Sequence, residues 1–214
     1  MRFFKKRMPA KSLAVMLMDF TLTGDAYSGD AGRFALGPHG ISVSDGTNVL
    51  PEDAQRTDWE HLSSRDSLVI ALETMYLRGF AVSILVESLV RNKQVREAVL
   101  ASYKNFWKNW SREGGLNYED FYEKAVLLYK GQLLISDLEA QLGRSKPNPS
   151  ERELAETVEL IGNEFSKMCD PFDLIREPLR SELAKRGQET FREALHVVTN
   201  LLQAALEKYR ITAT

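Results

Sequence analysis

The sequence predicts an all-α protein, an irregular bundle of about six or seven helices around a central apolar helix at residues 67–90. Residues 67–90 form the most apolar run of the chain. Apolar side chains recur at spacings of three and four residues through most of residues 93–209, which is typical of one buried face on each helix. Capping residues and glycines separate these stretches and mark the ends of the predicted helices.

The first segment, residues 1–22, is predicted to be a basic start that leads into a short helix. Pro9 suits the first turn of that helix. Its buried face is expected to contain Leu13, Met16, Leu17 and Phe20. Residues 1–11 hold five cations and no acid, and we expect most of this start to be frayed.

Two other interpretations of the N-terminus stay open. In the first, the N-terminus contacts a membrane surface or another polyanion. Each cation near an anionic membrane contributes ~1 kcal/mol of binding free energy. The residues of this candidate contact are Arg2, Phe3, Phe4, Lys5, Lys6 and Arg7. Alternatively it is a cleaved secretory signal, although Asp19 ends the short apolar stretch before any small-residue cleavage site.

Residues 23–62 form a glycine-rich, acidic excursion between the first helix and the helical bundle. Alternating fragments on both sides of Asp45-Gly46 are typical of a small β-hairpin. Gly24 and Gly29 have the separation of a phosphate-binding loop, but Asp30 stands where that loop needs a lysine. We therefore expect a weakly structured excursion rather than a ligand cradle.

The central helix begins at a capping-box pattern formed by Ser63 and Asp66. Charges at Glu73, Arg78 and Glu87 interrupt it, whereas a membrane span needs about 20 consecutive apolar residues. We therefore predict a buried core helix. Glu73 and Glu87 are expected on a narrow polar strip opposite the apolar face, about 21 Å apart and too far to act on one bond.

Five further helical stretches follow. Asn92 precedes the first, in which Val95, Val99, Ser102, Phe106 and Trp110 are predicted to face the core. The second is expected to bury a wide leucine-rich face that includes Leu127 and Leu128. The third carries the stripe Leu154, Val158, Ile161, Phe165 and Met168. A short fourth helix is predicted through Leu174, Leu179 and Leu183, with kinks or breaks at Pro178 and Gly187. The last helix carries Phe191, Leu195, Val198, Leu202, Ala205 and Tyr209.

Length and composition bound the organisation of the chain. Its 214 residues suit one domain, divided here into residues 1–22, 23–62 and a helical bundle at 63–214. The single cysteine, Cys169, forms no intramolecular disulfide, which suits a reducing interior, and we expect a soluble cytoplasmic protein. The net charge of −2 hides a basic tip of +5 and a remainder with 23 basic and 30 acidic residues.

Basic and aromatic residues interleave in residues 103–112, a pattern that suits either partner contact or stacking on single-stranded bases. The acidic body and the lack of an RNA-binding signature argue against nucleic acid. The candidate interaction residues are Lys104, Trp107, Lys108 and Arg112. The C-terminal stripe is equally suited to bundle packing or self-association.

Candidates for chemistry are weak. Glu193 and His196 resemble half of a two-iron carboxylate motif, but the chain has no second Glu-x-x-His pair. Cys169 lacks any local nucleophile signature and is expected to be a small buried hydrophobe. No cofactor is predicted.

The sequence therefore leaves three functional hypotheses open. The first is a non-enzymatic helical interaction protein, an adaptor or regulator that binds a protein partner or itself. The second is a metal- or apolar-ligand-binding protein or enzyme that uses Glu193 and His196. The third is a peripheral membrane-surface protein anchored by residues 1–11.

Overall fold

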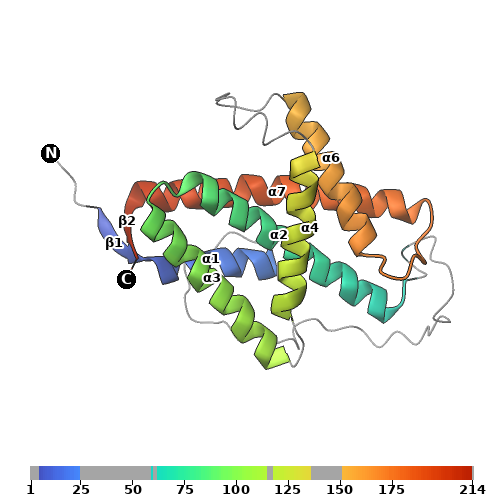
Figure 1. Cartoon of the computed structure of the whole chain (residues 1–214), viewed down its shortest axis with the longest axis horizontal. Coiled ribbons are helices and arrows are strands. Elements are labelled where there is room, and N and C mark those ends of the chain that lie inside the picture. The colour runs from blue at the N-terminus through green and yellow to red at the C-terminus, as the bar shows by residue number, and fades with distance from the viewer. Residues whose placement is uncertain (1–4, 25–58, 60–61, 115–117, 136–150, 214) are drawn as a thin grey trace. The chain divides into compact units, whose positions relative to one another are not determined.

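The computed structural model describes residues 5–24, 59, 62–114, 118–135 and 151–213 (Figure 1). These residues form six α-helices and one pair of short parallel strands, which confirms the predicted all-α fold. The elements are β1 (Lys6–Pro9), α1 (Ala10–Thr23), α2 (Ser64–Leu89), α3 (Lys93–Gly114), α4 (Tyr118–Ile135), α6 (Glu151–Met168), α7 (Leu179–Lys208) and β2 (Tyr209–Thr212). The glycine-rich excursion predicted at 23–62, with its hairpin signal, lies almost wholly outside the described residues.

The chain divides into two compact units. Unit 1 comprises residues 1–40, 78–123 and 193–214, and unit 2 comprises residues 41–77 and 124–192. Helices α2, α4 and α7 each contribute residues to both units. These bounds differ from those of the predicted segments 1–22, 23–62 and 63–214. The division of one domain into those segments stays a prediction.

Helix α2 begins at the capping box that the sequence predicts, and a side-chain cap also begins α3. The backbone N–H of Asp66 donates to Ser63 Oγ at 3.2 Å, and the backbone N–H of Ser63 donates to Asp66 Oδ2 at 2.9 Å. At the next helix, the backbone N–H of Val95 donates to Asn92 Oδ1 at 3.1 Å. These side chains satisfy backbone donors that the first turn of a helix leaves without partners.

Helix α2 is buried over a wide arc. Its buried residues include Met75, Tyr76, Leu77, Phe80, Ala81, Val82 and Val86. By length and composition alone, residues Arg65–Leu89 could cross a membrane, with a mean hydropathy of 1.7. The core helix of a soluble protein meets the same criteria of length and apolar composition. In this helix, 61% of the apolar window that meets them is buried inside the protein.

Aromatic side chains from several helices form the core of unit 1. Thr21 and Tyr103 share a hydroxyl–hydroxyl hydrogen bond of 2.6 Å, and Ser83 and Tyr122 share one of 2.7 Å. The Trp107 ring stacks on Tyr122 with centroids 4.6 Å apart. The predicted inward face of α3 is therefore wrong in its second half: Tyr103 and Trp107 are buried, whereas Phe106 and Trp110 are half-buried.

Close packing of α6 against α7 organises unit 2. Val158, Ile161 and Phe165 are buried as the stripe on α6 predicts. A Cβ atom on Gly162 would lie 2.5 Å from the carbonyl oxygen of Ala184, so the two helices approach closely there. A break at Gly187 and a separate short helix before it are wrong, because α7 continues from Leu179 through Gly187, which packs against Phe165.

Helix α4 turns a different face inward from the one predicted. Its buried residues are Tyr122, Ala125 and Tyr129. Leu127 and Leu128 are 71% and 37% exposed, so the expectation that they widen a buried face is wrong. Tyr122 takes one inward position because its hydroxyl group shares a hydrogen bond with Ser83 of α2, which satisfies the polar end of a buried ring.

The two strands join the first and last described segments of the chain. Strand β1 pairs in parallel with β2, with Lys6 opposite Tyr209 and Met8 opposite Ile211. The prediction that the basic start is frayed is therefore wrong for residues 6–9, which form a strand. Tyr209 begins the second strand instead of ending the last helical stripe.

Candidate functional site

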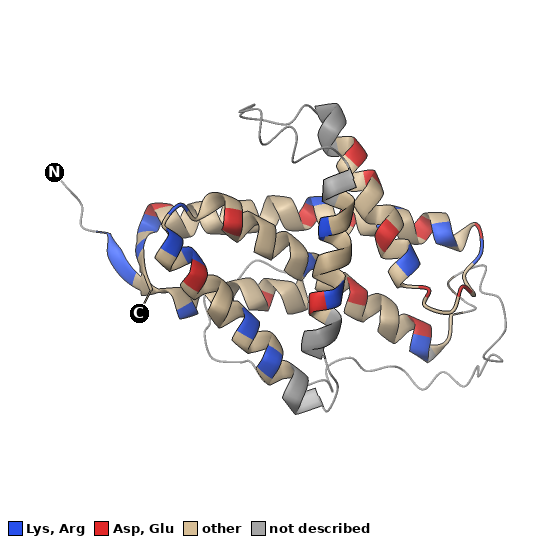
Figure 2. Ribbon diagram, in the orientation of Figure 1, with Lys and Arg blue, Asp and Glu red and all other residues tan. Residues whose placement is uncertain are grey.

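The parallel pairing of β1 and β2 collects cations from both ends of the sequence. We define the basic ribbon as β1 and β2 together with Lys5, Lys11 and Lys208. Its cations are Lys5, Lys6, Arg7, Lys11, Lys208 and Arg210, and all are exposed. Figure 2 shows the colour of lysine and arginine on the strand pair, near the described ends of the chain. The rest of the chain holds 22 basic and 30 acidic residues, so the ribbon is the chain's main basic feature.

Local chemistry explains why the ribbon holds together. One face is half-buried and contains Met8, Tyr209 and Ile211, which suits a strand pair resting on helices. The Lys5 ammonium donates to the carbonyl oxygen of Leu206 at 2.7 Å. That carbonyl lies in the last turn of α7, where the helix dipole favours positive charge. The ribbon therefore places a cation where the helix end stabilises it.

The four interaction residues predicted on α3 do not form one surface. Lys104 and Lys108 are exposed, and Lys104 forms an ion pair with Glu123. Trp107 is 0% exposed and stacks on Tyr122, so the expectation that it meets a partner at the surface is wrong. The Arg112 side chain lies outside the part of the chain that the structure describes.

The metal candidates lie on the surface of α7. Glu193 and His196 are both exposed, and His196 Nε2 lies 3.1 Å from the Asn200 amide nitrogen. Among the described residues, no three His, Cys, Asp or Glu side chains gather as a metal site requires. His39 and His61 fall outside the described residues.

A cluster of titratable side chains lies inside unit 2. Burial raises the pKa of Glu73 to about 8, although the charge of Lys124 opposes this. Glu73 Oε2 is buried and has no hydrogen-bond partner among the described residues. Burial also raises the pKa of the Cys169 thiol, which is 2% exposed. A buried thiol whose pKa is raised is a poor nucleophile, so Cys169 fits its predicted role as a small hydrophobe.

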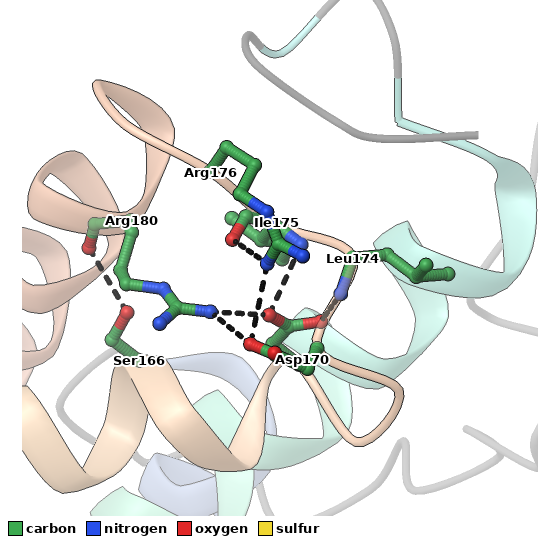
Figure 3. Close-up of polar contacts among 7 residues, drawn as sticks. Ser166, Asp170, Leu174, Ile175, Arg176 and Arg180 are labelled. Carbon is green, nitrogen blue, oxygen red and sulfur yellow. Dashed lines mark hydrogen bonds and ion pairs between the residues drawn. The ribbon is translucent and has the colours of Figure 1, made fainter. Parts of the chain in front are cut away.

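The connection between α6 and α7 and the first turn of α7 contain a polar network (Figure 3). Asp170 accepts hydrogen bonds from the backbone N–H groups of Leu174 at 2.7 Å and Ile175 at 3.0 Å. Arg180 donates to the same carboxylate at 2.9 Å and to Asp173 at 2.7 Å. Because these groups satisfy one another within the connection, we interpret the network as structural.

Sequence reasoning found the N-terminal half of the ribbon but missed the C-terminal half. Tyr209, Ile211 and Thr212 are aromatic or β-branched residues that favour strands, and this was the available signal. It did not reveal the pairing partner, because β1 lies some 200 residues away in sequence. No family model matches the chain, and no curated protein or solved structure was found to match it.

Proposed function

We propose that this chain attaches reversibly to anionic phospholipid surfaces through the basic ribbon. The observation that carries the proposal is the pairing of β1 with β2, which joins Arg210 and Lys208 to the cations of the N-terminus. Each cation near an anionic membrane contributes ~1 kcal/mol. Six exposed cations therefore offer on the order of 6 kcal/mol before the cost of immobilising the protein.

The distribution of charge supports an oriented encounter. Outside the ribbon's six cations the chain carries a formal charge of −8, so an anionic surface repels the body while it attracts the ribbon. The attraction acts over a Debye length of about 10 Å at 0.1 M salt. Binding is therefore expected to weaken steeply as salt rises.

Apolar groups beside the cations favour a lipid surface over nucleic acid. Phe3 and Phe4 directly precede the ribbon in the sequence. Such residues enter the interfacial region of a bilayer, whereas nucleic-acid readers use extended basic tracks. The acidic body does not extend the ribbon into such a track.

The test is co-sedimentation of the untagged chain with vesicles of neutral phosphatidylcholine, with and without phosphatidylserine. Binding is expected only with phosphatidylserine and is expected to fall as salt is raised. Equal binding to both vesicles would contradict the electrostatic mechanism. Binding to single-stranded or duplex nucleic acid, with none to vesicles, would replace the proposed partner.

The other hypotheses receive less support from the described residues. The interaction hypothesis is weaker because Trp107 is buried and cannot contact a partner at the surface. Lys104, another of its residues, already forms an ion pair with Glu123. The ligand hypothesis has only the exposed pair Glu193 and His196. Both hypotheses, and the expected cytoplasmic location, stay predictions.

A further inference from the structure

Arg7 and Arg210 are partners in the register of the parallel strands. Side chains of paired residues project from the same face of a sheet, and neighbouring strands lie about 4.8 Å apart. Met8, Tyr209 and Ile211 occupy the alternate, half-buried face, whereas both arginines are exposed. The two arginine side chains therefore leave the strands from neighbouring positions on the outer face of the basic ribbon.

Such a pair of like charges destabilises the strands that carry it. In the part of the chain that the structure describes, the ion pairs found join other residues and leave both arginines without a carboxylate. An anion held between the two side chains would convert their repulsion into two attractive contacts. The geometry therefore favours the ribbon in its anion-bound state.

We propose that Arg7 and Arg210 form a discrete binding site for a phosphate monoester group. This inference rests on the proposed function, because it names the headgroup that the basic ribbon prefers. The group is carried either by a phospholipid with a terminal phosphate or by a soluble phosphate compound. The site belongs to both termini at once and exists only when β1 and β2 are paired.

The choice of a monoester follows from the donors. Each guanidinium presents a planar fork that binds two oxygen atoms in parallel. A monoester offers three terminal oxygens and nearly two negative charges, so it can receive two forks. The phosphodiester group of phosphatidylserine has one charge and two free oxygens, so this group satisfies only one fork well, and the ammonium beside the serine carboxylate opposes a second arginine.

The vesicle experiment compares phosphatidic acid with phosphatidylserine at equal surface charge. The natural chain is expected to bind phosphatidic acid about tenfold more tightly, the value of one additional charge-assisted contact. Arg7→Lys and Arg210→Lys keep the charge but lose the fork, so each should abolish this preference and change binding to phosphatidylserine less than about twofold. Arg192→Lys, at an exposed position of α7 in unit 2, is the matched control and should keep the preference.

A second experiment asks whether the free protein recognises soluble phosphate. Inorganic phosphate should raise the Tm of the natural chain relative to chloride at equal ionic strength, and it should not raise the Tm of Arg7→Lys or Arg210→Lys. A phosphate-dependent Tm without vesicle binding would support the site with a soluble source and overturn the proposed membrane function. Equal binding to both lipids without any phosphate effect on Tm would overturn the site and leave the membrane function standing. Loss of the preference in Arg192→Lys would also overturn it.

Discussion

Glu73 places an acidic group inside unit 2, on the helix that the sequence marks as most apolar. Its pKa of about 8 lies above the ordinary value of 4.5 because burial disfavours the charged form. The unfolded chain releases this proton near the ordinary value, whereas the folded chain holds it until about pH 8. Stability that is complete below the unfolded pKa is therefore lost as the pH rises through this window.

Glu73→Gln should remove this pH dependence, because the amide resembles the protonated carboxyl and does not ionise. The natural chain is expected to lose up to about 1.4 kcal/mol of unfolding free energy per pH unit across the window, and the variant should lose much less. Urea unfolding at several pH values measures the difference. Glu159→Gln, exposed on α6, is the control and should follow the natural chain. Parallel pH profiles for Glu73→Gln and the natural chain would show that Glu73 is ionised in the fold.

Two helical glycines, one tightly packed and one with open space beside it, provide a matched test of the packing around α2. A Cβ atom on Gly79 would lie 2.8 Å from Tyr122 Cε2 and 3.2 Å from Trp107 Cζ2, whereas one on Gly131 meets nothing within 4 Å. Gly79→Ala should therefore lower the free energy of unfolding by about 1–3 kcal/mol. Gly131→Ala should raise it by up to about 1 kcal/mol through helix propensity. Chemical denaturation measures both, and stabilisation by Gly79→Ala would contradict the described aromatic packing.

Residue-scale prediction succeeded where local pattern decides the environment. Cys169, at the end of an apolar stripe, is buried as expected. It failed for Trp107, because neighbouring helix positions differ by about 100° in direction and both candidate faces contain aromatic rings. The choice between them depends on contacts with Thr21 and Tyr122, which a local pattern does not contain.

At the scale of elements, the α6–α7 connection depends on one carboxylate. The Asp170 side chain is 5% exposed and binds two backbone N–H groups and Arg180. Asp170→Asn replaces one acceptor by an N–H donor that faces other donors. We expect it to lower the free energy of unfolding by about 2 kcal/mol.

Asp173→Asn is the matched control for this connection. Asp173 is largely exposed, and its backbone adopts a φ of 54°, which asparagine tolerates. Denaturant unfolding of both variants should show a much smaller loss for Asp173→Asn. Similar losses for the two would mean that Asp170 does not organise the connection.

The helices were largely predictable from sequence, and the strands were not. Capping by Ser63 and Asn92 is a local signal, and so is the spacing of the stripe on α6. The pairing of β1 with β2 joins opposite ends of the chain through four residues on each side. Strands this short carry little periodic information, so their partner is fixed only by the packing of the whole of unit 1.

At the scale of the whole molecule, charge separation is the property on which the proposed membrane attachment depends. The sequence shows the basic N-terminus, but only the structure adds Lys208 and Arg210 to it. The candidate site was therefore half predictable. Its other half depends on the fold, because the two groups of cations meet only when the chain ends pair.

The most direct test of membrane attachment is vesicle co-sedimentation with two triple variants of equal net charge. One removes ribbon cations as Lys6→Gln, Arg7→Gln and Arg210→Gln; the other removes exposed cations elsewhere as Lys108→Gln, Lys185→Gln and Arg192→Gln. We expect the ribbon variant to bind phosphatidylserine vesicles about a hundredfold more weakly, at about fivefold for each cation, and the other variant to bind nearly as the natural chain does. Equal losses in both variants, or none in the ribbon variant, would contradict attachment through the basic ribbon.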